Sequence, residues 1–334
     1  MSIPITVGSV AVPGRVWLAP MTGISDLPFR LTATRLGASY VATEMVACES
    51  FAQARPEAVR RAAVGEGLPL MVVQLVGADP AAVRRAASLA SDAGAQIIDL
   101  NFGCPAKSVT GIACGSALMR DLDAAERIIA AAVDGARAPV TVKMRLGWDA
   151  ASRNAPALAE RARAAGAAGL TVHGRTRQQF YTDAADWTAV AEVAAATDLP
   201  LVVNGDVTDL ASARQALAQS GARGVMIGRG ALGRPWIAAA IAARLAGRPF
   251  CEPGPEERLE IVLGHLAESL RFHGPIHGVR TFRKHLAAYV NAAAWVAADQ
   301  RRAARARLCR LDSELEIAAG LGELWSAPRE RMAA

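Results

Sequence analysis

The sequence predicts an α/β fold in which a (β/α)8 TIM barrel is followed by a small all-helical C-terminal domain. Over residues 1–247, short β-branched or apolar segments alternate with Ala-rich stretches of helical periodicity. Strands this apolar, separated by helices, are typical of a parallel sheet that is buried on both faces. Eight such units in about 250 residues fit a closed barrel. From residue 256 onward only helical periodicity remains.

The barrel strands are predicted from the apolar segments. They are Val16–Met21, Tyr40–Met45, Leu70–Leu75, Ile97–Gly103, Val140–Leu146, Gly169–Arg175, Leu201–Val207 and Gly224–Gly230. Helices predicted between them include Pro80–Ala93, Ala124–Ala136, Ala155–Ala165 and Asp209–Ser220. Several are followed by a glycine of the kind that caps helices. A doubly wound open sheet is the alternative, but the first strand ends in Ala19-Pro20-Met21 without the Gly-rich turn of that fold.

The C-terminal part is predicted to be a separate helical unit. Residues 248–255 contain Pro and Gly and are expected to link the barrel, 1–247, to a helical domain, 256–326. Four helices are expected there, at Glu257–Phe272, Val279–Val290, Asp299–Leu311 and Ser313–Trp325. The last residues, 327–334, are expected to fray.

The composition excludes several classes of protein. A hydrophobic content of 52% with 20% charged residues excludes a disordered chain. No apolar run reaches the roughly 18–20 residues that span a bilayer, so no membrane association is expected. Residues 1–15 lack the basic start and apolar core of a signal peptide. The five cysteines are scattered and form no CxxC pair, which favours a reducing cytoplasm and disfavours a metal site.

Positive charge is concentrated near the C-terminus. Between Arg271 and Arg310 there are nine basic residues and one acid, whereas the net charge of the whole chain is +6. We call residues 271–310 the basic segment. A localised basic face indicates a polyanionic partner, with nucleic acid ahead of a membrane. The alternative is a solvated helix surface in a protein that favours arginine, since only three of its 37 basic residues are lysines.

The active site of such a barrel is expected at the C-terminal ends of its strands. Polar or otherwise special residues occupy that edge of every predicted strand, and a purely structural barrel would need no such ring. They are Pro20, Met21, Glu44, Gln74, Asn101, Cys104, Lys143, Arg145, His173, Arg175, Asn204, Gly205, Asp206, Gly228 and Arg229.

The last two strands predict a phosphate site. Asn204-Gly205-Asp206 and Gly228-Arg229 place glycines and backbone amides where barrels commonly hold a phosphate. Glycine lets the backbone approach an anion, and the Arg229 guanidinium can add charge-assisted hydrogen bonds. The alternative for each glycine alone is a tight βα turn.

Two further side chains are candidate cofactor ligands. Lys143 stands near the end of the fifth strand in a chain that otherwise uses arginine for positive charge, which indicates a compact ammonium group directed at a ring atom or phosphate. His173 occupies the equivalent place on the next strand. The alternatives are a lysine that only closes the barrel mouth and a histidine that is satisfied within the core.

Cys104 is the candidate acid. It lies on the loop after the fourth strand, between Gly103 and Pro105, with Lys107 nearby. An unperturbed thiol, with a pKa of about 8.5, is protonated near neutrality yet able to release its proton. The other four cysteines, at 48, 114, 251 and 309, are expected to be small, mostly buried apolar residues.

At these segments the sequence resembles the bacterial tRNA-dihydrouridine synthases, most closely their B-type branch. The similar stretches are residues 19–30, 99–107, 115–119, 142–148, 172–177, 203–206 and 226–230. They include the specific elements Cys104-Pro105 and His173-Gly-Arg-Thr176, and further similarity continues through 233–236 into the C-terminal helices. Phe102 is the one departure, because some relatives carry Met or Cys there.

The resemblance implies an FMN-dependent enzyme that reduces D-loop uridine in tRNA to 5,6-dihydrouridine, with NADPH re-reducing the flavin. It implies that Cys104 is a general acid that protonates C5. Implied FMN ligands are Pro20, Met21, Thr22, Gln74, Lys143, His173, Asn204, Gly205, Asp206, Gly228 and Arg229. Asn101 would orient the uracil, and no obligate protein partner is implied.

We expect the RNA to contact positive charge at the barrel rim and in the basic segment. The candidate substrate-binding residues are Asn101, Lys107, Arg145, Arg175, Arg177, Arg280, Arg283, Lys284, Arg301, Arg302 and Arg305. Two alternatives stay open. One is an FMN barrel that acts on a free pyrimidine, which leaves the basic segment without a role. The other is an RNA-binding or regulatory protein that kept the barrel scaffold without catalysis. The presence of Cys104, Lys143 and His173 together disfavours this second alternative.

Overall fold

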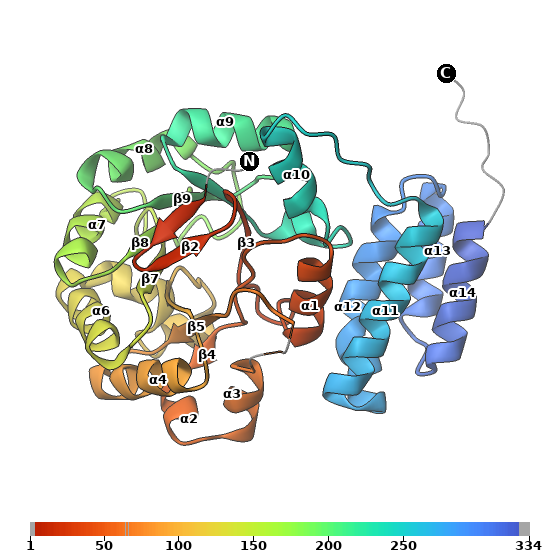
Figure 1. Cartoon of the computed structure of the whole chain (residues 1–334), viewed down its shortest axis with the longest axis horizontal. Helices are drawn as coiled ribbons and strands as arrows, with labels where there is room; N and C mark the ends of the chain where they lie inside the picture. Colours follow the sequence, from red (N-terminus) through yellow and green to blue (C-terminus); the bar gives the residue numbers. More distant parts are fainter. Residues whose placement is uncertain (1–3, 64, 66, 327–334) are drawn as a thin grey trace.

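The computed structural model describes residues 4–63, 65 and 67–326, and it confirms a (β/α)8 barrel followed by C-terminal helices (Figure 1). Eight parallel strands form one sheet in the order β3-β10-β9-β8-β7-β6-β5-β4. They are β3 (Val16–Leu18), β4 (Val46–Ala47), β5 (Val72–Val76), β6 (Ile97–Phe102), β7 (Val140–Arg145), β8 (Gly169–His173), β9 (Leu201–Asn204) and β10 (Gly224–Ile227). A parallel bridge between Leu18 and Val41 brings the first and second strand segments together.

The predicted second strand, Tyr40–Met45, is wrong in its bounds. Only isolated contacts occur there, such as Thr43 N donating to Val72 O at 3.0 Å, and regular pairing begins at Val46. The cause is local: the N–H of Gln74 donates to the Thr43 hydroxyl at 3.0 Å instead of to a backbone carbonyl. Other predicted strands extend too far into their loops. For example, β9 ends at Asn204 because Gly205 adopts a φ of +116°.

Helices cover the outside of the barrel. They are α1 (Leu27–Arg35), α2 (Cys48–Ala52), α3 (Pro56–Arg61), α4 (Pro80–Asp92), α6 (Leu122–Gly135), α7 (Ala155–Ala164), α8 (Trp187–Ala196), α9 (Leu210–Ser220) and α10 (Ile237–Leu245), whereas the one-turn helix α5 (Lys107–Thr110) lies in the loop after β6. Aspartates at 26, 79, 121, 186 and 209 cap the N-termini of five of them through a side-chain oxygen. The apolar faces of these helices pack on the outward residues of the sheet, so that Val83 and Ile129 share one core with Val142.

A short antiparallel hairpin, which the sequence patterns did not predict, precedes the barrel. It consists of β1 (Ile5–Val7) and β2 (Val10–Val12), and it lies across the barrel in Figure 1. Its apolar residues join the inward-facing core that includes Trp17 and Tyr40, whose rings stack at 4.1 Å. The barrel interior therefore has an apolar N-terminal end, and its polar residues lie nearer the other end.

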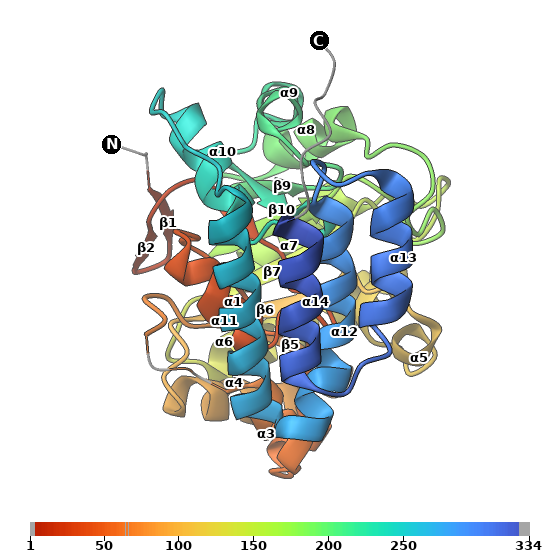
Figure 2. The same ribbon diagram turned by 90° about the vertical axis from the view of Figure 1, so that its right-hand side faces the viewer.

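As far as residue 326, where the described part of the chain ends, four helices follow the barrel and lie side by side in Figure 2: α11 (Pro255–His273), α12 (Pro275–Ala292), α13 (Ala298–Leu308) and α14 (Glu314–Ser326). They share a core that includes Val262, Phe282 and Leu308. Helix α11 packs against α1 of the barrel. The barrel also approaches α12 at Gly233, where a Cβ would collide with the carbonyl oxygen of Ala288, so that approach requires glycine.

Three sequence expectations concern peripheral parts of the chain. Within the described ranges, no helix is long and apolar enough to cross a membrane. The expected frayed tail, 327–334, lies outside the described residues. Cys48 and Cys114 are buried as expected, but the expectation is wrong for Cys251, which is exposed in the segment between α10 and α11, and Cys309 is only half-buried.

Candidate active site

A cleft of about 800 Å³ lies at the C-terminal ends of the strands. Every predicted cofactor residue lines it: Pro20, Met21, Thr22, Gln74, Lys143, His173, Asn204, Gly205, Asp206, Gly228 and Arg229. Cys104, Asn101 and Arg145 line it as well. The barrel closure brings these residues together, although almost 210 positions separate the first from the last.

A chain of hydrogen bonds runs from the barrel interior to the Cys104 loop. The carboxylate of Asp99 accepts from the Thr141 hydroxyl and from the Gln74 amide, both at 2.7 Å. The Gln74 carbonyl accepts from Asn101 Nδ2 at 2.8 Å, and Asn101 Oδ1 accepts from the backbone N–H of Cys104 at 2.8 Å. Gln74 therefore holds the Asn101 side chain, and Asn101 holds the Cys104 loop. Both residues also line the cleft.

Asp99 was not predicted from the sequence, although a signal was present, since it is the one charged residue within the strand β6. Burial raises its pKa to about 6, and the hydrogen bonds from Thr141 and Gln74 oppose that rise. Asp99 is 1% exposed, so it is not accessible to a ligand in the cleft. It instead holds the side-chain amide of Gln74 in place.

Lys143 points its amine across the barrel toward the end of β9. Its Nζ donates to Asn204 Oδ1 at 3.0 Å, and Asn204 Nδ2 donates in turn to the carbonyl oxygen of Met226 at 2.8 Å. Burial lowers the Lys143 pKa to about 8, while the negative charge of Asp99 acts in the opposite direction. The amine is thus charged at neutral pH and loses its proton under mildly alkaline conditions.

His173 is held neutral. Burial lowers its pKa well below the ordinary value, and the positive charges of Lys143, Arg145 and Arg175 lower it further. Its Nδ1 is buried and has no hydrogen-bond partner among the residues that the structure describes. His173 lines the cleft together with Lys143, so a neutral imidazole and a cationic amine face the same cavity.

Asp206 connects two arginines at the ends of β8 and β10. Its Oδ2 accepts from Arg175 at 2.5 Å and its Oδ1 from Arg229 at 3.4 Å. Burial opposes ionisation of Asp206, but the hydrogen bonds from Arg175 and from the N–H of Ala185 outweigh it and hold its pKa below the usual value. Arg229 is exposed, and its guanidinium lies 4.8 Å from the ring centre of Tyr181.

The placement of Arg175 corrects its assignment as an RNA contact. The side chain is 2% exposed and donates to the carbonyl oxygens of Thr182 and Asp183 as well as to Asp206. Arg145 is likewise buried, and it donates to the carbonyl oxygens of Gly103, Thr176 and Phe180. Both arginines hold the loops that form the wall of the cleft, although Arg145 also faces the cleft.

The Cys104 loop is fixed from both sides. The hydroxyl of Ser116 donates to the Cys104 carbonyl oxygen at 2.8 Å. Gly115 adopts a φ of +61°, and a Cβ there would lie 3.0 Å from the same oxygen. Cys104 is half-buried and lines the cleft. Ser116 was not predicted, because its place in the sequence gave no sign of this hydrogen bond.

The remaining predicted substrate contacts lie outside the cleft. Lys107 is exposed at the start of α5, and the Arg177 guanidinium lies over the Trp148 ring at 4.6 Å. In the basic segment, Arg280, Lys284, Arg302 and Arg305 are exposed. Arg283 instead pairs with Asp312 at 2.7 Å, and Arg301 donates to the carbonyl oxygens of Asn291 and Ala293. These two arginines are thus partly engaged within the helical domain.

An exposed aromatic pair was also not predicted. Phe180 and Tyr181 are 43% and 47% exposed, line the cleft, and contact each other edge-to-face at 5.1 Å. Exposed aromatic rings beside arginines are a common platform for a nucleobase. The sequence signal was the Phe-Tyr dipeptide in an otherwise polar loop.

Comparison with known proteins places the chain among one family of enzymes. A family model described as "Dihydrouridine synthase (Dus)" matches residues 17–317. A "Probable tRNA-dihydrouridine synthase" of Rhodobacter capsulatus is 50% identical over 293 residues, which covers 87% of this chain and 90% of the relative. A "tRNA-dihydrouridine synthase B" of Xanthomonas axonopodis pv. citri is 43% identical over 285 residues, covering 85% and 86%.

Solved structures support the fold. Morphinone reductase superposes with a TM-score of 0.52 at 17% identity, over 77% of this chain and 92% of that one. At this identity the likeness shows the barrel alone.

Proposed function

The chain belongs to the dihydrouridine synthase family of oxidoreductases, and on that premise we propose that it reduces D-loop uridine in tRNA to 5,6-dihydrouridine, with FMN bound in the cleft and NADPH as reductant. One observation carries the proposal. The cleft combines a cationic end, formed by Lys143 and Arg229, with a thiol, Cys104, that projects from a different strand end. One cavity therefore offers groups for both a phosphate-bearing cofactor and a proton donor.

The residues of the cationic end fit a flavin phosphate. The Lys143 amine and the Arg229 guanidinium supply positive charge, and Gly205 and Gly228 present backbone without a side chain to the cleft. His173 and Lys143 both line the cleft, where the imidazole and the amine can contact the polar atoms of a ring or a ribityl chain. When bound, FMN would supply the hydride that reaches C6 of the uracil.

Cys104 supplies the proton in this proposal. As the C5–C6 double bond is lost, C6 takes a hydride and C5 takes the thiol proton, and solvent then reprotonates the thiolate. Asn101 and Ser116 fix the backbone of Cys104 itself. Asn101 accepts a hydrogen bond from the Cys104 N–H, and Ser116 donates one to the Cys104 carbonyl oxygen. That restraint fixes the backbone that carries the thiol, so the donor is positioned before the substrate binds.

The RNA must present an unstacked base to this cleft, which costs a few kcal/mol. Exposed Arg302 and Arg305 of α13 and the exposed Arg280 and Lys284 of α12 offer phosphate contacts that would offset this cost. Phe180 and Tyr181 at the cleft rim offer a stacking surface for the base or its neighbour.

The test compares the unaltered enzyme with Cys104→Ala. We expect the variant to retain flavin and to reduce it with NADPH, but to form dihydrouridine in unmodified tRNA at least about 100-fold more slowly, which is the lower range for loss of a general acid. Cys251→Ala, which removes an exposed cysteine outside the cleft, is the matched control and should keep full activity. Full activity in Cys104→Ala would refute the acid assignment.

The same assay also distinguishes a tRNA substrate from a free pyrimidine. If the enzyme reduces free uridine as fast as it reduces tRNA, it acts on a free pyrimidine and the helical domain has another role. If the purified protein neither binds flavin nor oxidises NADPH, the catalytic proposal as a whole is wrong.

A further inference from the structure

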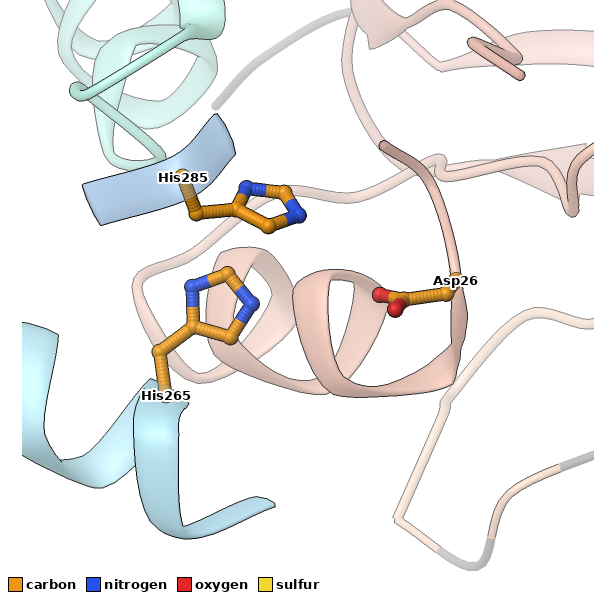
Figure 3. Close-up of side chains that lie close together, drawn as sticks. All are labelled: Asp26, His265 and His285. Carbon is orange, nitrogen blue, oxygen red and sulfur yellow. The ribbon is translucent and has the colours of Figure 1, made fainter. Parts of the chain in front are cut away.

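A buried cluster lies where the helical domain meets the barrel, apart from the cleft. Asp26 comes from the N-cap of α1, His265 from α11 and His285 from α12. Their exposed fractions are 7%, 1% and 3%. One carboxylate oxygen and one ring nitrogen of each histidine lie within 4.8 Å of one another. Figure 3 shows both imidazoles with a ring nitrogen directed toward the Asp26 carboxylate.

Each of the two histidines has a ring nitrogen in this cluster that makes no hydrogen bond to the described residues. Nε2 of His265 and Nε2 of His285 are buried and have no hydrogen-bond partner in the described part of the chain. A buried polar atom without a partner costs free energy, so such atoms are rare unless a bound group satisfies them. The two unpaired imidazole nitrogens and the carboxylate beside them therefore form a set of three atoms that one cation could bind.

The surroundings hold these side chains in place for such a partner. Nδ1 of His265 lies 3.1 Å from the Tyr289 hydroxyl, a contact that leaves the Nε2 lone pair free when Nδ1 carries the proton. Asp26 Oδ2 is 2.9 Å from His273 Nε2, which orients the carboxylate. The ring of His285 stacks on Phe29 at 5.6 Å.

We propose that Asp26, His265 and His285 bind one divalent transition-metal ion of the Zn²⁺ class and that this ion joins the helical domain to the barrel. Two imidazoles and one carboxylate are a common donor set for such ions, with water in a fourth position. The ligand atoms lie within 4.8 Å of one another, whereas the ligands of a tetrahedral Zn²⁺ ion are about 3.3 Å apart, so binding requires them to approach by up to about 1.5 Å. Because α1 belongs to the barrel and α11 and α12 to the helical domain, the bound ion cross-links the two parts.

The experiment uses the full chain, first stripped of metal with a chelator and then titrated with Zn²⁺ against a chromophoric chelator, and separately with Co²⁺. We expect one tight equivalent per chain, a visible d–d absorption for Co²⁺ bound by nitrogen and oxygen, and a melting temperature that rises by several degrees on loading. His265→Gln and His285→Gln should each weaken binding at least about tenfold and remove the temperature shift.

Two further variants keep the test decisive. His277→Gln removes an exposed histidine close to His273 and should bind metal as the unaltered protein does. Asp26→Asn retains an acceptor for the N-cap of α1, so it preserves the fold while removing the charged ligand, and it should weaken binding even if the histidine variants do not fold.

Three results would overturn the proposal: no tight equivalent in the unaltered chain, equal affinity in Asp26→Asn and the unaltered chain, or a thiolate-to-cobalt charge-transfer band, which would place the ion at a cysteine. None of these readouts uses the reductase activity, so the site stands or fails independently of the proposed function.

Discussion

The side-chain carbonyl oxygen of Asn101 accepts a hydrogen bond from the backbone N–H of Cys104 at 2.8 Å. The same oxygen accepts from Gly103 N at 3.1 Å, while Nδ2 of Asn101 donates to Gln74. Asn101 thereby couples the thiol-bearing loop to the rigid strand β6 and to its neighbour β5. In the proposed reaction, the position of the Cys104 thiol therefore depends on the side-chain amide of Asn101.

Asn101→Ala should therefore lower the rate of dihydrouridine formation at least about tenfold, because the thiol loses its fixed position. Flavin content and flavin reduction by NADPH should not change. Asn101→Asp keeps an acceptor for Cys104 N but loses the donor to Gln74, so we expect an intermediate rate. Single-turnover reduction of tRNA measures the effect. Equal rates for all three proteins would show that Asn101 does not position the Cys104 thiol.

Asp206→Asn should lower the free energy of unfolding by roughly 3 kcal/mol, since it leaves the buried Arg175 guanidinium without its anionic partner. The value is at the lower end for a broken buried pair because Thr182 and Asp183 still accept from Arg175. Denaturant unfolding measures it. Asp312→Asn is the control, because that carboxylate pairs with Arg283 at the surface and its loss should cost about 1 kcal/mol or less.

The stability that Asp206 contributes also depends on pH. Its pKa in the folded protein lies below the ordinary value of 3.8. The contribution is therefore complete above the unfolded-state pKa and is lost as the pH falls through the folded-state pKa. The stability difference between Asp206→Asn and the unaltered protein should narrow as the pH is lowered below about 4, and a constant difference down to about pH 2 would contradict this account.

The pKa of Lys143, about 8, predicts how FMN binding responds to pH. Above pH 8 the amine loses its proton and one positive charge leaves the cleft, so the dissociation constant for FMN should rise. Lys143→Met should bind FMN more weakly below that pH and show a flatter profile. Fluorescence titration with FMN from about pH 6 to about 9.5 brackets the transition. If the dissociation constants of the two proteins depend on pH in the same way, Lys143 is not the group that titrates.

Burial of Lys143 has an opposite consequence for stability. Its pKa is lower in the folded chain than the ordinary 10.5, so the unfolded chain binds more protons between about pH 8 and 10.5. Stability should rise with pH across that window in the absence of FMN. Lys143→Met should abolish this rise, as measured by denaturant unfolding of the flavin-free protein at several pH values.

The fold and the ring of cleft residues could be predicted because both follow from local patterns. A parallel strand places its last residues at one edge, so Lys143, His173 and Asn204 were identified without knowledge of their contacts. Burial at that edge could not be predicted. Arg175 and Arg229 both follow strand ends, yet only the structure shows that Arg175 turns inward to Asp206 while Arg229 remains exposed.

The cluster at the domain junction shows a second limit. Metal motifs are found in sequences by short spacings, but His265 and His285 lie on different helices and Asp26 lies in the barrel. The packing of α11 on α1 brings them together. In the same way, Thr43 interrupts the second strand through a hydrogen bond to a residue 31 positions away, which no local pattern contains.

Charge reversal on α13 tests the interaction with RNA. Arg302→Glu with Arg305→Glu should weaken tRNA binding and reduce the slope of log affinity against log salt by about one for each phosphate that is no longer neutralised. The control reverses Arg84 and Arg163, which are exposed on barrel helices α4 and α7, and so makes the same change in net charge. If both double variants lower the slope equally, the effect follows from net charge, and the basic segment is only a solvated surface. A reduction confined to the α13 variant identifies that helix as an RNA contact.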